Sequence, residues 1–520
     1  MKTKTLKPFF RPSHWLLTLL VGALTMQPAW TQNNTLPSLG NGEGISLGAE
    51  RQLGDRIARE LYRDPDYLED PVLDEYIQQL WAPLVKAAAA RGELSPELQE
   101  RFAWRILLGR DRSVNAFALP GGYLGVHLGL IAVVSSNDEL ASVLAHELSH
   151  VTQRHIARNM NDQAKMTPWV IGSMILGALA ASKSAQGAQA LIVGGQAAAV
   201  QSQLSYSRDM EREADRVGYG ILVDAGYDPQ GFVGMFAKLQ QAAGLNDSGA
   251  FPYLRSHPLT TERLADMQAR QQLSTPSTKA PTDMAQAMLA ARARVLSQNS
   301  PDALKAWTQD AESVIGTSPA QKAGALYAAT LAHLQMRHMA AADRTLKALG
   351  QWVASSLTES PTSLAAQRWL RLLSAEVAFK QDRFEAVLTT LMPNAGPVAL
   401  QRPELLAVAQ ALLRLPRHPL QADITRQLRS LVQQAPNDAQ AWQSLAGLLS
   451  LQGQALASLR AEGEAQIARL DWSGAIDRLR AAQDLARQGR LQAGDHIEAS
   501  IVDTRLRQAQ DRLRALQTPR

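Results

Sequence analysis

The segment HELSH at residues 146–150 is the feature that most constrains how this chain of 520 residues can fold. Positions four apart in an α-helix lie on the same face, so the two imidazoles meet at one point only if the segment is helical. Ser136 and Glu139 have the spacing of a capping box, and apolar residues follow at helical intervals. The sequence therefore predicts one helix that begins after Ser136 and contains the whole segment.

Two imidazoles on one helix face are typical of a zinc site. The chain has no cysteine, so His146 and His150 can share a metal ion only with further His, Asp or Glu ligands. Imidazole nitrogens suit Zn²⁺, which in catalytic sites keeps one position for water. Glu147 lies one residue along the helix and is expected to act as the general base on that water. We therefore predict a metalloprotease that binds one Zn²⁺ per chain.

The third ligand is expected from residues 206–215, a later stretch that is rich in charged residues. Glu211 and Asp215 are four residues apart, so they share one helix face. One carboxylate can bind the metal while the other holds a ligand imidazole. The spacing alone does not choose among Glu211, Glu213 and Asp215, and a solvated charged helix face is the alternative interpretation.

Strands are predicted in one region only. Residues 104–108 have the apolar character of a strand, and residues 115–119 and 123–128 flank a Pro-Gly-Gly turn as a hairpin. The rest of the chain is rich in alanine and leucine and favours helices. We predict a mainly α protein, in which an α+β metalloprotease domain with a small β-sheet precedes an α-helical domain. An exposed strand of the hairpin would offer an edge to an extended peptide.

The N-terminus has the order of a secretory signal peptide. Basic residues precede an apolar run from Trp15 to Leu24, and small residues and a proline follow. The apolar run is about half of the ~20 residues that span a bilayer. We predict that residues 1–31 are a signal peptide for export to the periplasm and that residues 32–47 are a mobile leader. An uncleaved membrane anchor is the alternative.

The rest of the chain divides into further segments. Residues 168–200 are small and apolar, which predicts a buried or lid-like helical hairpin; a surface that touches a membrane or a client is the alternative. Residues 274–284 are expected to link a zinc metalloprotease domain at 48–273 to a helical repeat domain at 285–520. Helix pairs, clearest at residues 436–482, resemble a solenoid of tetratricopeptide repeats (TPR), with an ordinary α-helical domain as the alternative.

Three segments resemble the HtpX-type zinc metallopeptidases: HELSH at 146–150, SRDMEREAD at 207–215 and NAFALPGG at 115–122. With the N-terminal segment, the SHP segment at 256–258 and the helical repeats, they are similar to the BepA-like periplasmic chaperone/proteases. The resemblance covers residues 45–270 most strongly and implies a zincin-like fold.

The same resemblance implies roles for residues that the spacing leaves open. Glu211 is the implied third zinc ligand, and Asp215 is the implied carboxylate that supports the catalytic group. His257 corresponds to a histidine that can occupy the open zinc position as a fourth ligand and hold the enzyme latent.

Two other histidines are not expected to bind metal. His155 lies five residues after His150, a spacing that points it away from the shared helix face, so we expect a structural or surface position. His127 falls in the predicted hairpin, where we expect it to pack or to line a substrate groove.

The expected function is that of an endopeptidase with a chaperone role. The resemblance implies action on misfolded or assembling outer-membrane proteins, with the repeats binding the outer-membrane assembly machinery. A repeat-bearing chaperone with secondary proteolysis is the alternative, and an integral-membrane protease is a third hypothesis. A net charge of +5, with the charges well mixed along the chain, gives no indication of nucleic-acid binding.

Overall fold

The structure is a computed structural model that describes residues 45–162, 206–244, 251–272, 283–313, 318–355, 361–392, 399–488 and 495–517. The predicted signal peptide, nearly all of the leader, the apolar segment and most of the linker lie outside these residues. Residues Ile45–Arg520 form one compact unit. Within the part described, no helix is both long enough and apolar enough to cross a bilayer.

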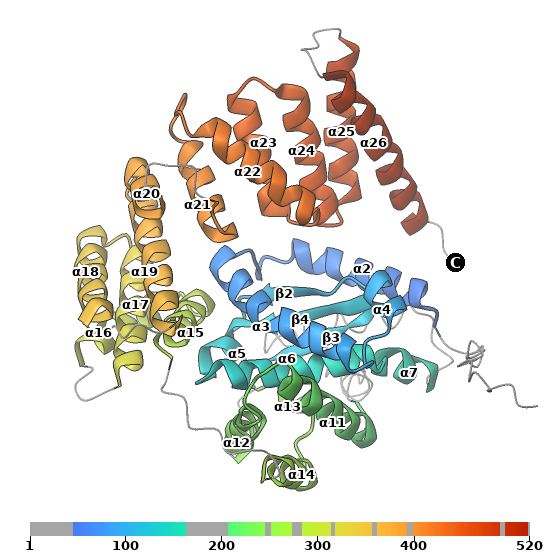
Figure 1. Ribbon diagram of the computed structural model, residues 1–520, viewed down its shortest axis with the longest axis vertical. Helices are drawn as coiled ribbons and strands as arrows, with labels where there is room; N and C mark the ends of the chain where they lie inside the picture. Colours follow the sequence, from blue (N-terminus) through green and yellow to red (C-terminus); the bar gives the residue numbers. More distant parts are fainter. Residues whose placement is uncertain are drawn as a thin grey trace, which may run out of the picture. The chain divides into compact units, whose positions relative to one another are not determined.

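The three strands predicted from the sequence, β2 (Arg105–Gly109), β3 (Ala116–Leu119) and β4 (Tyr123–His127), form one sheet with a short strand that was not predicted, β1 (Tyr67–Leu68). Their order is β1-β2-β4-β3, with β2 and β4 parallel and with β3 and β4 forming the predicted antiparallel hairpin (Figure 1). A 3-10 turn, η1 (Pro120–Gly122), closes the hairpin. It requires glycine at two positions, because φ is +72° at Gly121 and +82° at Gly122.

Helices cover both faces of this sheet. Alternate residues of a strand point to opposite faces, so Leu107 and Tyr123 pack against Leu53 of α2 (Leu47–Arg63). Leu108 and Leu124 point the other way into the main core, which also contains apolar residues of α3 (Pro71–Ala90) and α6 (Asn137–Thr152). The sheet is therefore buried on both sides, and α6 lies along the β3 edge.

The helix that contains HELSH begins where the sequence predicts. The Ser136 hydroxyl accepts a hydrogen bond from the Glu139 N–H at 3.2 Å, whereas the Glu139 carboxylate accepts from the N–H of Ser135 at 2.6 Å rather than returning to Ser136. After α6 ends, Arg154 adopts a positive φ of 53°. This residue redirects the chain, so α7 (His155–Asp162) starts at once in a new direction.

The helix α11 (Arg208–Asp224) packs closely against α6. Ser207 caps its N-terminus by accepting a hydrogen bond from the Met210 N–H. At Gly218 a Cβ atom would lie 3.1 Å from the carbonyl oxygen of Ala145 and 3.2 Å from Cα of His146. The missing side chain at Gly218 therefore allows the two helix backbones to approach each other at the first histidine of the motif.

The remaining helices of the N-terminal half surround this pair. α12 packs on α6, and α14 packs on both α11 and α12. In the chain, α13 is followed closely by α14. The bounds of the helices not yet given are α4 (Pro96–Arg101), α5 (Leu128–Val133), α12 (Gln230–Gly244), α13 (Tyr253–Ser256) and α14 (Thr261–Gln272).

The C-terminal half is helical throughout the residues described, as predicted. Successive helices pack side by side, most regularly from α22 to α26 in the orange and red part of Figure 1. Residues with positive φ, among them Arg337, Asp382 and Gly453, reverse the chain between helices. The bounds are α15 (Met284–Ser297), α16 (Pro301–Ser313), α17 (Pro319–Gln335), α18 (Met339–Ser355), α19 (Pro361–Lys380), α20 (Phe384–Leu391), α21 (Arg402–Leu412), α22 (Gln421–Gln434), α23 (Ala439–Leu451), α24 (Ala455–Ala468), α25 (Trp472–Arg487) and α26 (Asp495–Gln517).

Ion pairs connect these helices to the start of α3. We call residues 69–75, at and before the N-terminus of α3, the acidic segment. Its four carboxylates lie within ion-pair distance of four arginines of the C-terminal half: Glu69 with Arg469, Asp70 with Arg292, Asp74 with Arg402 and Glu75 with Arg368. The Asp70–Arg292 pair is the most buried, with side chains 8% and 7% exposed and 2.6 Å between Oδ2 and Nη2.

Substitution of Asp70 tests the contribution of this buried pair. Asp70→Asn removes the charge opposite Arg292, and Arg292 is then left buried with only the Glu376 carboxylate as a countercharge. Leaving one partner of a buried pair without its countercharge costs about 3 kcal/mol of stability. We expect the free energy of unfolding, measured by urea denaturation followed by circular dichroism, to decrease by this amount.

The matched control is Asp511→Asn, because Asp511 pairs with Arg514 on the exposed surface of α26. An exposed pair of this kind contributes less than about 0.5 kcal/mol. Equal unfolding midpoints for the two variants would contradict the role of the Asp70 pair.

Candidate metal centre

The two histidines of the motif face each other inside the protein. His146 and His150 lie one turn apart on α6, and their Nε2 atoms are 3.0 Å apart. Both side chains are almost completely buried, at 1% and 0% exposure. The predicted helix therefore brings two imidazole nitrogens to one point, as the four-residue spacing requires.

A carboxylate and a third imidazole complete the group. Glu211 of α11 has Oε2 at 3.5 Å from Nε2 of His146 and Oε1 at 3.6 Å from Nε2 of His150. His257, which follows α13, has Nδ1 at 3.0 Å from Oε1 of Glu211. One ligand atom from each of these four residues lies within 4.8 Å of all the others, and they are the only such group among the residues that the structure describes.

The chemistry of these donors fits a metal ion. Two imidazoles, a carboxylate and a further imidazole are the nitrogen and oxygen ligands that divalent transition metals prefer. Four buried atoms of the group and of Glu147 have no hydrogen-bond partner: Nδ1 of His146, Oε1 of Glu147, Oε2 of Glu211 and Nε2 of His257. An unpartnered buried polar atom is costly, so the last three are consistent with a cation or water at this position.

Asp215 and Arg263 hold His146 from behind. Oδ1 of Asp215 lies 2.9 Å from Nδ1 of His146, and the Arg263 guanidinium donates two hydrogen bonds to Asp215, at 2.6 and 2.8 Å. Burial alone would raise the pKa of Asp215, but the hydrogen bonds from Arg263 and His146 lower it. A carboxylate at this distance from Nδ1 is placed to fix the ring of His146 with Nε2 towards the other donors.

Glu211 is kept ionised by its neighbours. Burial alone would raise its pKa, but the charge of His257 and the hydrogen bonds from His146 and His257 hold it well below the ordinary value. Arg263 adds a contact of 2.8 Å to Oε2 of Glu211. A carboxylate that stays ionised in a buried site can serve as an anionic metal ligand.

Glu147 lies between the donors and the edge of the sheet. Its side chain is completely buried, and Oε2 accepts a hydrogen bond of 2.9 Å from the N–H of Ala118 in β3. Its Oε1 lies 3.4 Å from Nε2 of His257. Burial raises the pKa of Glu147, while the charges of His257 and His146 act in the opposite direction. A carboxyl group with a raised pKa is suited to accept and return a proton.

Aromatic rings enclose the imidazoles. Tyr206 stacks on His150 with ring centroids 3.8 Å apart, and Tyr253 stacks on His257 at 4.5 Å. Sequence analysis did not single out either tyrosine, because no spacing rule connects them to the motif. The one available signal is their position, since Tyr206 immediately precedes the cap of α11 and Tyr253 lies four residues before His257.

The two histidines that were not expected to bind metal differ in their surroundings. His127 is packed in the sheet, where its Nδ1 lies 2.9 Å from the Ser113 hydroxyl, and it is not part of the donor group. His155 is completely buried, with Nδ1 only 2.8 Å from Nδ1 of His150. The surface alternative for His155 is therefore wrong, because the chain turns at Arg154 and the five-residue helical spacing does not apply.

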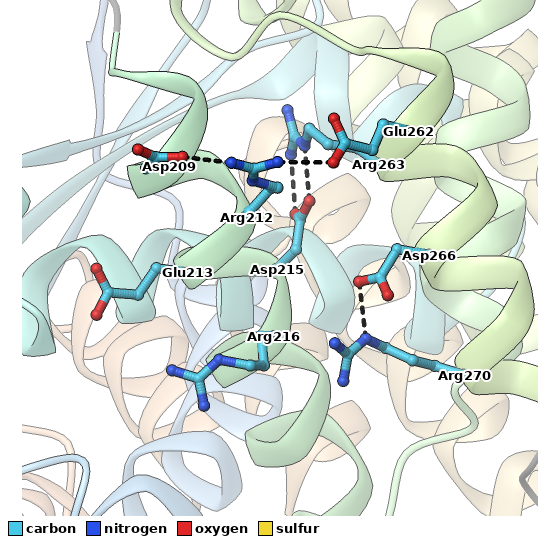
Figure 2. A pocket seen from close by; sticks show the side chains of 9 residues that line it. All are labelled: Asp209, Arg212, Glu213, Asp215, Arg216, Glu262, Arg263, Asp266 and Arg270. Atoms are coloured by element: carbon cyan, nitrogen blue, oxygen red, sulfur yellow. Dashed lines mark hydrogen bonds and ion pairs between the residues drawn. The ribbon is translucent and has the colours of Figure 1, made fainter.

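A charged pocket adjoins the support of the centre. Figure 2 shows it between α11 and α14, with a volume of about 670 Å³. Asp215 and Arg263 form part of its wall, but the metal donors do not line it. The full set of lining residues is Asp209, Arg212, Glu213, Asp215, Arg216, Glu262, Arg263, Asp266 and Arg270.

The fold and the donor group are those of a metallopeptidase. The sequence matches peptidase family M48 over residues 73–271, a range that contains the whole centre. It is 30% identical to the putative beta-barrel assembly-enhancing protease of Vibrio cholerae, over 93% of this chain and 95% of the relative. It is also 30% identical to the beta-barrel assembly-enhancing protease of Escherichia coli, over 96% and 97% of the two chains.

A further likeness covers a smaller share of the chain. The mitochondrial metalloendopeptidase OMA1 of Arabidopsis thaliana is 33% identical over 38% of this chain and 36% of the relative. The chain thus belongs to the family of beta-barrel assembly-enhancing proteases, within the M48 metallopeptidases.

Substitution of Gly218 tests whether the close helix approach is needed for the centre. Gly218→Val places side-chain atoms against the backbone at Ala145 and His146, which overpacks the contact and costs about 1–3 kcal/mol. Because Glu211 and Asp215 lie on the same helix, we expect Zn²⁺ affinity, measured by chelator competition, to fall at least about 10-fold.

Gly48→Val is the matched control, because a Cβ atom at Gly48 of α2 meets no other atom within 4 Å. We expect wild-type Zn²⁺ affinity for this variant. Unchanged affinity in Gly218→Val would show that α11 tolerates displacement from α6.

Proposed function

We propose that the protein is a zinc-dependent endopeptidase in which His146, His150 and Glu211 bind one Zn²⁺ per chain. The observation that supports this most directly is the convergence of buried donors within 4.8 Å beside the Glu147 carboxylate. Asp215 has the supporting role, since its contact with His146 fixes the imidazole that binds the metal. His, Glu and His is a ligand set known from catalytic zinc sites.

Peptide hydrolysis needs a nucleophile, a base and stabilisation of negative charge. Bound zinc supplies a Lewis acid that polarises the scissile carbonyl and lowers the pKa of water towards about 7. Glu147 takes a proton from the attacking water as the new C–O bond forms, and then gives that proton to the amine nitrogen as the peptide C–N bond breaks. Asp215 and Arg263 keep His146 in the tautomer that this chemistry requires.

The substrate is proposed to lie along β3. This strand is at the end of the sheet order, and the Asn115 carbonyl accepts a hydrogen bond from His127 on the β4 side. Antiparallel pairing alternates, so the backbone groups of Ala116 and Ala118 point away from β4. The Ala118 N–H reaches Glu147 on that side. An extended peptide paired with this edge would pass directly beside the catalytic carboxylate.

His257 is proposed to hold the enzyme latent as a fourth ligand. Its Nδ1 lies 3.3 Å from Nε2 of His146 and 3.0 Å from Glu211, which is the position that water and substrate need. Stacking on Tyr253 and burial at 1% exposure fix the ring there. Proteolysis would then require a client or partner that shifts His257 away.

The proposed substrates are misfolded or assembling outer-membrane β-barrel proteins. Support comes from relatives that are named beta-barrel assembly-enhancing proteases and are similar over nearly the whole chain. In this proposal residues 1–31 direct export to the periplasm and residues 48–273 form the protease domain. After the linker at 274–284, TPR-like helices at 285–520 bind the outer-membrane assembly machinery, and residues 168–200 allow peripheral membrane contact.

A chaperone function is the second candidate. It is favoured by the long succession of packed helices from α15 to α26, since stacked helix pairs of this kind offer extended binding surfaces. In that case client delivery is the main activity and proteolysis is secondary.

Glu147→Gln separates these functions. The amide cannot accept the proton, so we expect kcat/KM for casein-type digestion to fall at least about 100-fold, with one zinc per chain retained. Glu97→Gln, an exposed position on α4, is the control and should behave as wild type.

Full activity of Glu147→Gln would exclude Glu147 as the proposed base. Rescue of outer-membrane assembly by an inactive Glu147→Gln protein would favour the chaperone function.

His257→Ala tests the latent state. Removal of the imidazole opens the fourth position while His146, His150 and Glu211 remain, so we expect faster proteolysis with zinc still bound. His496→Ala, at an exposed position of α26, is the control and should leave the rate unchanged. Loss of activity in zinc-loaded His257→Ala would instead indicate that His257 assists catalysis.

A further inference from the structure

His146 and His150 differ in the group that contacts Nδ1, the ring nitrogen that points away from the metal position. Nδ1 of His146 faces a carboxylate, Asp215, at 2.9 Å. Nδ1 of His150 instead faces another imidazole, that of His155, at 2.8 Å. His155 is buried, and it lies at the first position of α7, where the turn at Arg154 directs it back towards α6.

His155 in turn contacts a carboxylate of α11. Its Nε2 lies 3.1 Å from Oε2 of Glu213, and the same oxygen lies 2.7 Å from Nη1 of Arg158. Arg158 is on α7, one turn after His155. Contacts within hydrogen-bond distance thus run from His150 through His155 and Glu213 to Arg158.

One arrangement of protons on the neutral imidazoles satisfies all of these contacts. Glu213 is a carboxylate and only accepts hydrogen bonds, so Nε2 of His155 must be the donor. Nδ1 of a neutral His155 is then an acceptor, and the proton between the two rings must belong to Nδ1 of His150. This leaves the lone pair on Nε2 of His150, the atom that lies 3.0 Å from Nε2 of His146.

We propose that His155 and Glu213 are positioning residues that fix the tautomer and ring orientation of His150 for metal binding. The inference rests on the proposed function, because it takes His150 as a ligand. It gives His150 the support that Asp215 and Arg263 give His146. Neither His155 nor Glu213 touches the substrate or the metal, so their effect passes through His150.

The position of Glu213 on α11 supports this assignment. It lies two residues after Glu211 and two before Asp215, so it leaves the helix on the side opposite to the face that those two carboxylates share. Glu211 faces the donor group and Asp215 faces His146, while Glu213 reaches the opposite side at His155. Stacking of Tyr206 on His150 restrains the same ring from its face.

The alternative is that His155 only fills space in the core. Two substitutions at this position separate the two roles. His155→Phe keeps an aromatic ring but removes both nitrogens, so Nδ1 of His150 loses its acceptor. His155→Asn gives up ring volume, but its side-chain oxygen can take the place of Nδ1 and accept the proton of His150.

The experiment measures Zn²⁺ affinity of the full chain by competition with a chelator, and the visible absorption spectrum of the Co²⁺-loaded protein. We expect His155→Phe to weaken Zn²⁺ binding about 10–100-fold and to alter the Co²⁺ spectrum. His155→Asn should recover most of the affinity. Affinity in His155→Phe equal to wild type, or higher than in His155→Asn, would overturn the inference and indicate a packing role.

Glu213→Ala provides a test that does not disturb the core, since the Glu213 side chain is 29% exposed. It should weaken Zn²⁺ binding about 10-fold. Glu262→Ala is its control, because Glu262 contacts Arg212 beside the same pocket without touching an imidazole. Unchanged Zn²⁺ affinity in Glu213→Ala would show that Glu213 is not a positioning residue.

Failure of this inference and failure of the proposed function give different results. If the wild-type protein binds no stoichiometric Zn²⁺, the proposed function is wrong. If the wild type binds one Zn²⁺ and the His155 and Glu213 variants bind it equally well, only the positioning role is wrong.

Discussion

The close crossing of α6 and α11 is the contact on which the centre depends. The two motif imidazoles, His146 and His150, come from α6, whereas Glu211, Glu213 and Asp215 come from α11. Gly218 makes this crossing possible, since a side chain there would meet the backbone at Ala145 and His146. The sheet and α2 lie on the other side and place β3 along α6. The protein thus builds most of its site where two helix backbones come into near contact, and the segment after α13 adds His257.

The parts of the fold that could be predicted are those that follow from local rules. The HELSH segment specifies a helix, because only helical geometry brings its two imidazoles together. The Pro-Gly-Gly turn specifies the hairpin, since two consecutive residues with positive φ strongly favour glycine. The donors His146, His150 and Glu211 lie together as the motif and the resemblance predict, and His257 lies beside them.

Other features depend on contacts between distant residues and leave no local pattern. Spacing alone could not choose among Glu211, Glu213 and Asp215, and the structure explains why, since all three approach histidines of the site. His155 was expected in a structural or surface position, and the surface alternative is wrong because one residue, Arg154, ends the helical periodicity. The ion pairs of the acidic segment join residues 222 to 400 positions apart, which no sequence pattern could indicate.

The arrangement of carboxylates along α11 has a consequence for sequence variation in this family. An α-helix advances by about 1.5 Å and turns by about 100° for each residue. A single insertion between Glu211 and Gly218 would therefore rotate the residues on its two sides relative to each other. Some carboxylates would then no longer reach an imidazole, or Gly218 would no longer face the α6 backbone. Changes in chain length should be absent from this stretch of α11, even where substitutions are tolerated. The spacing of these residues, as well as their identities, determines whether the site can form.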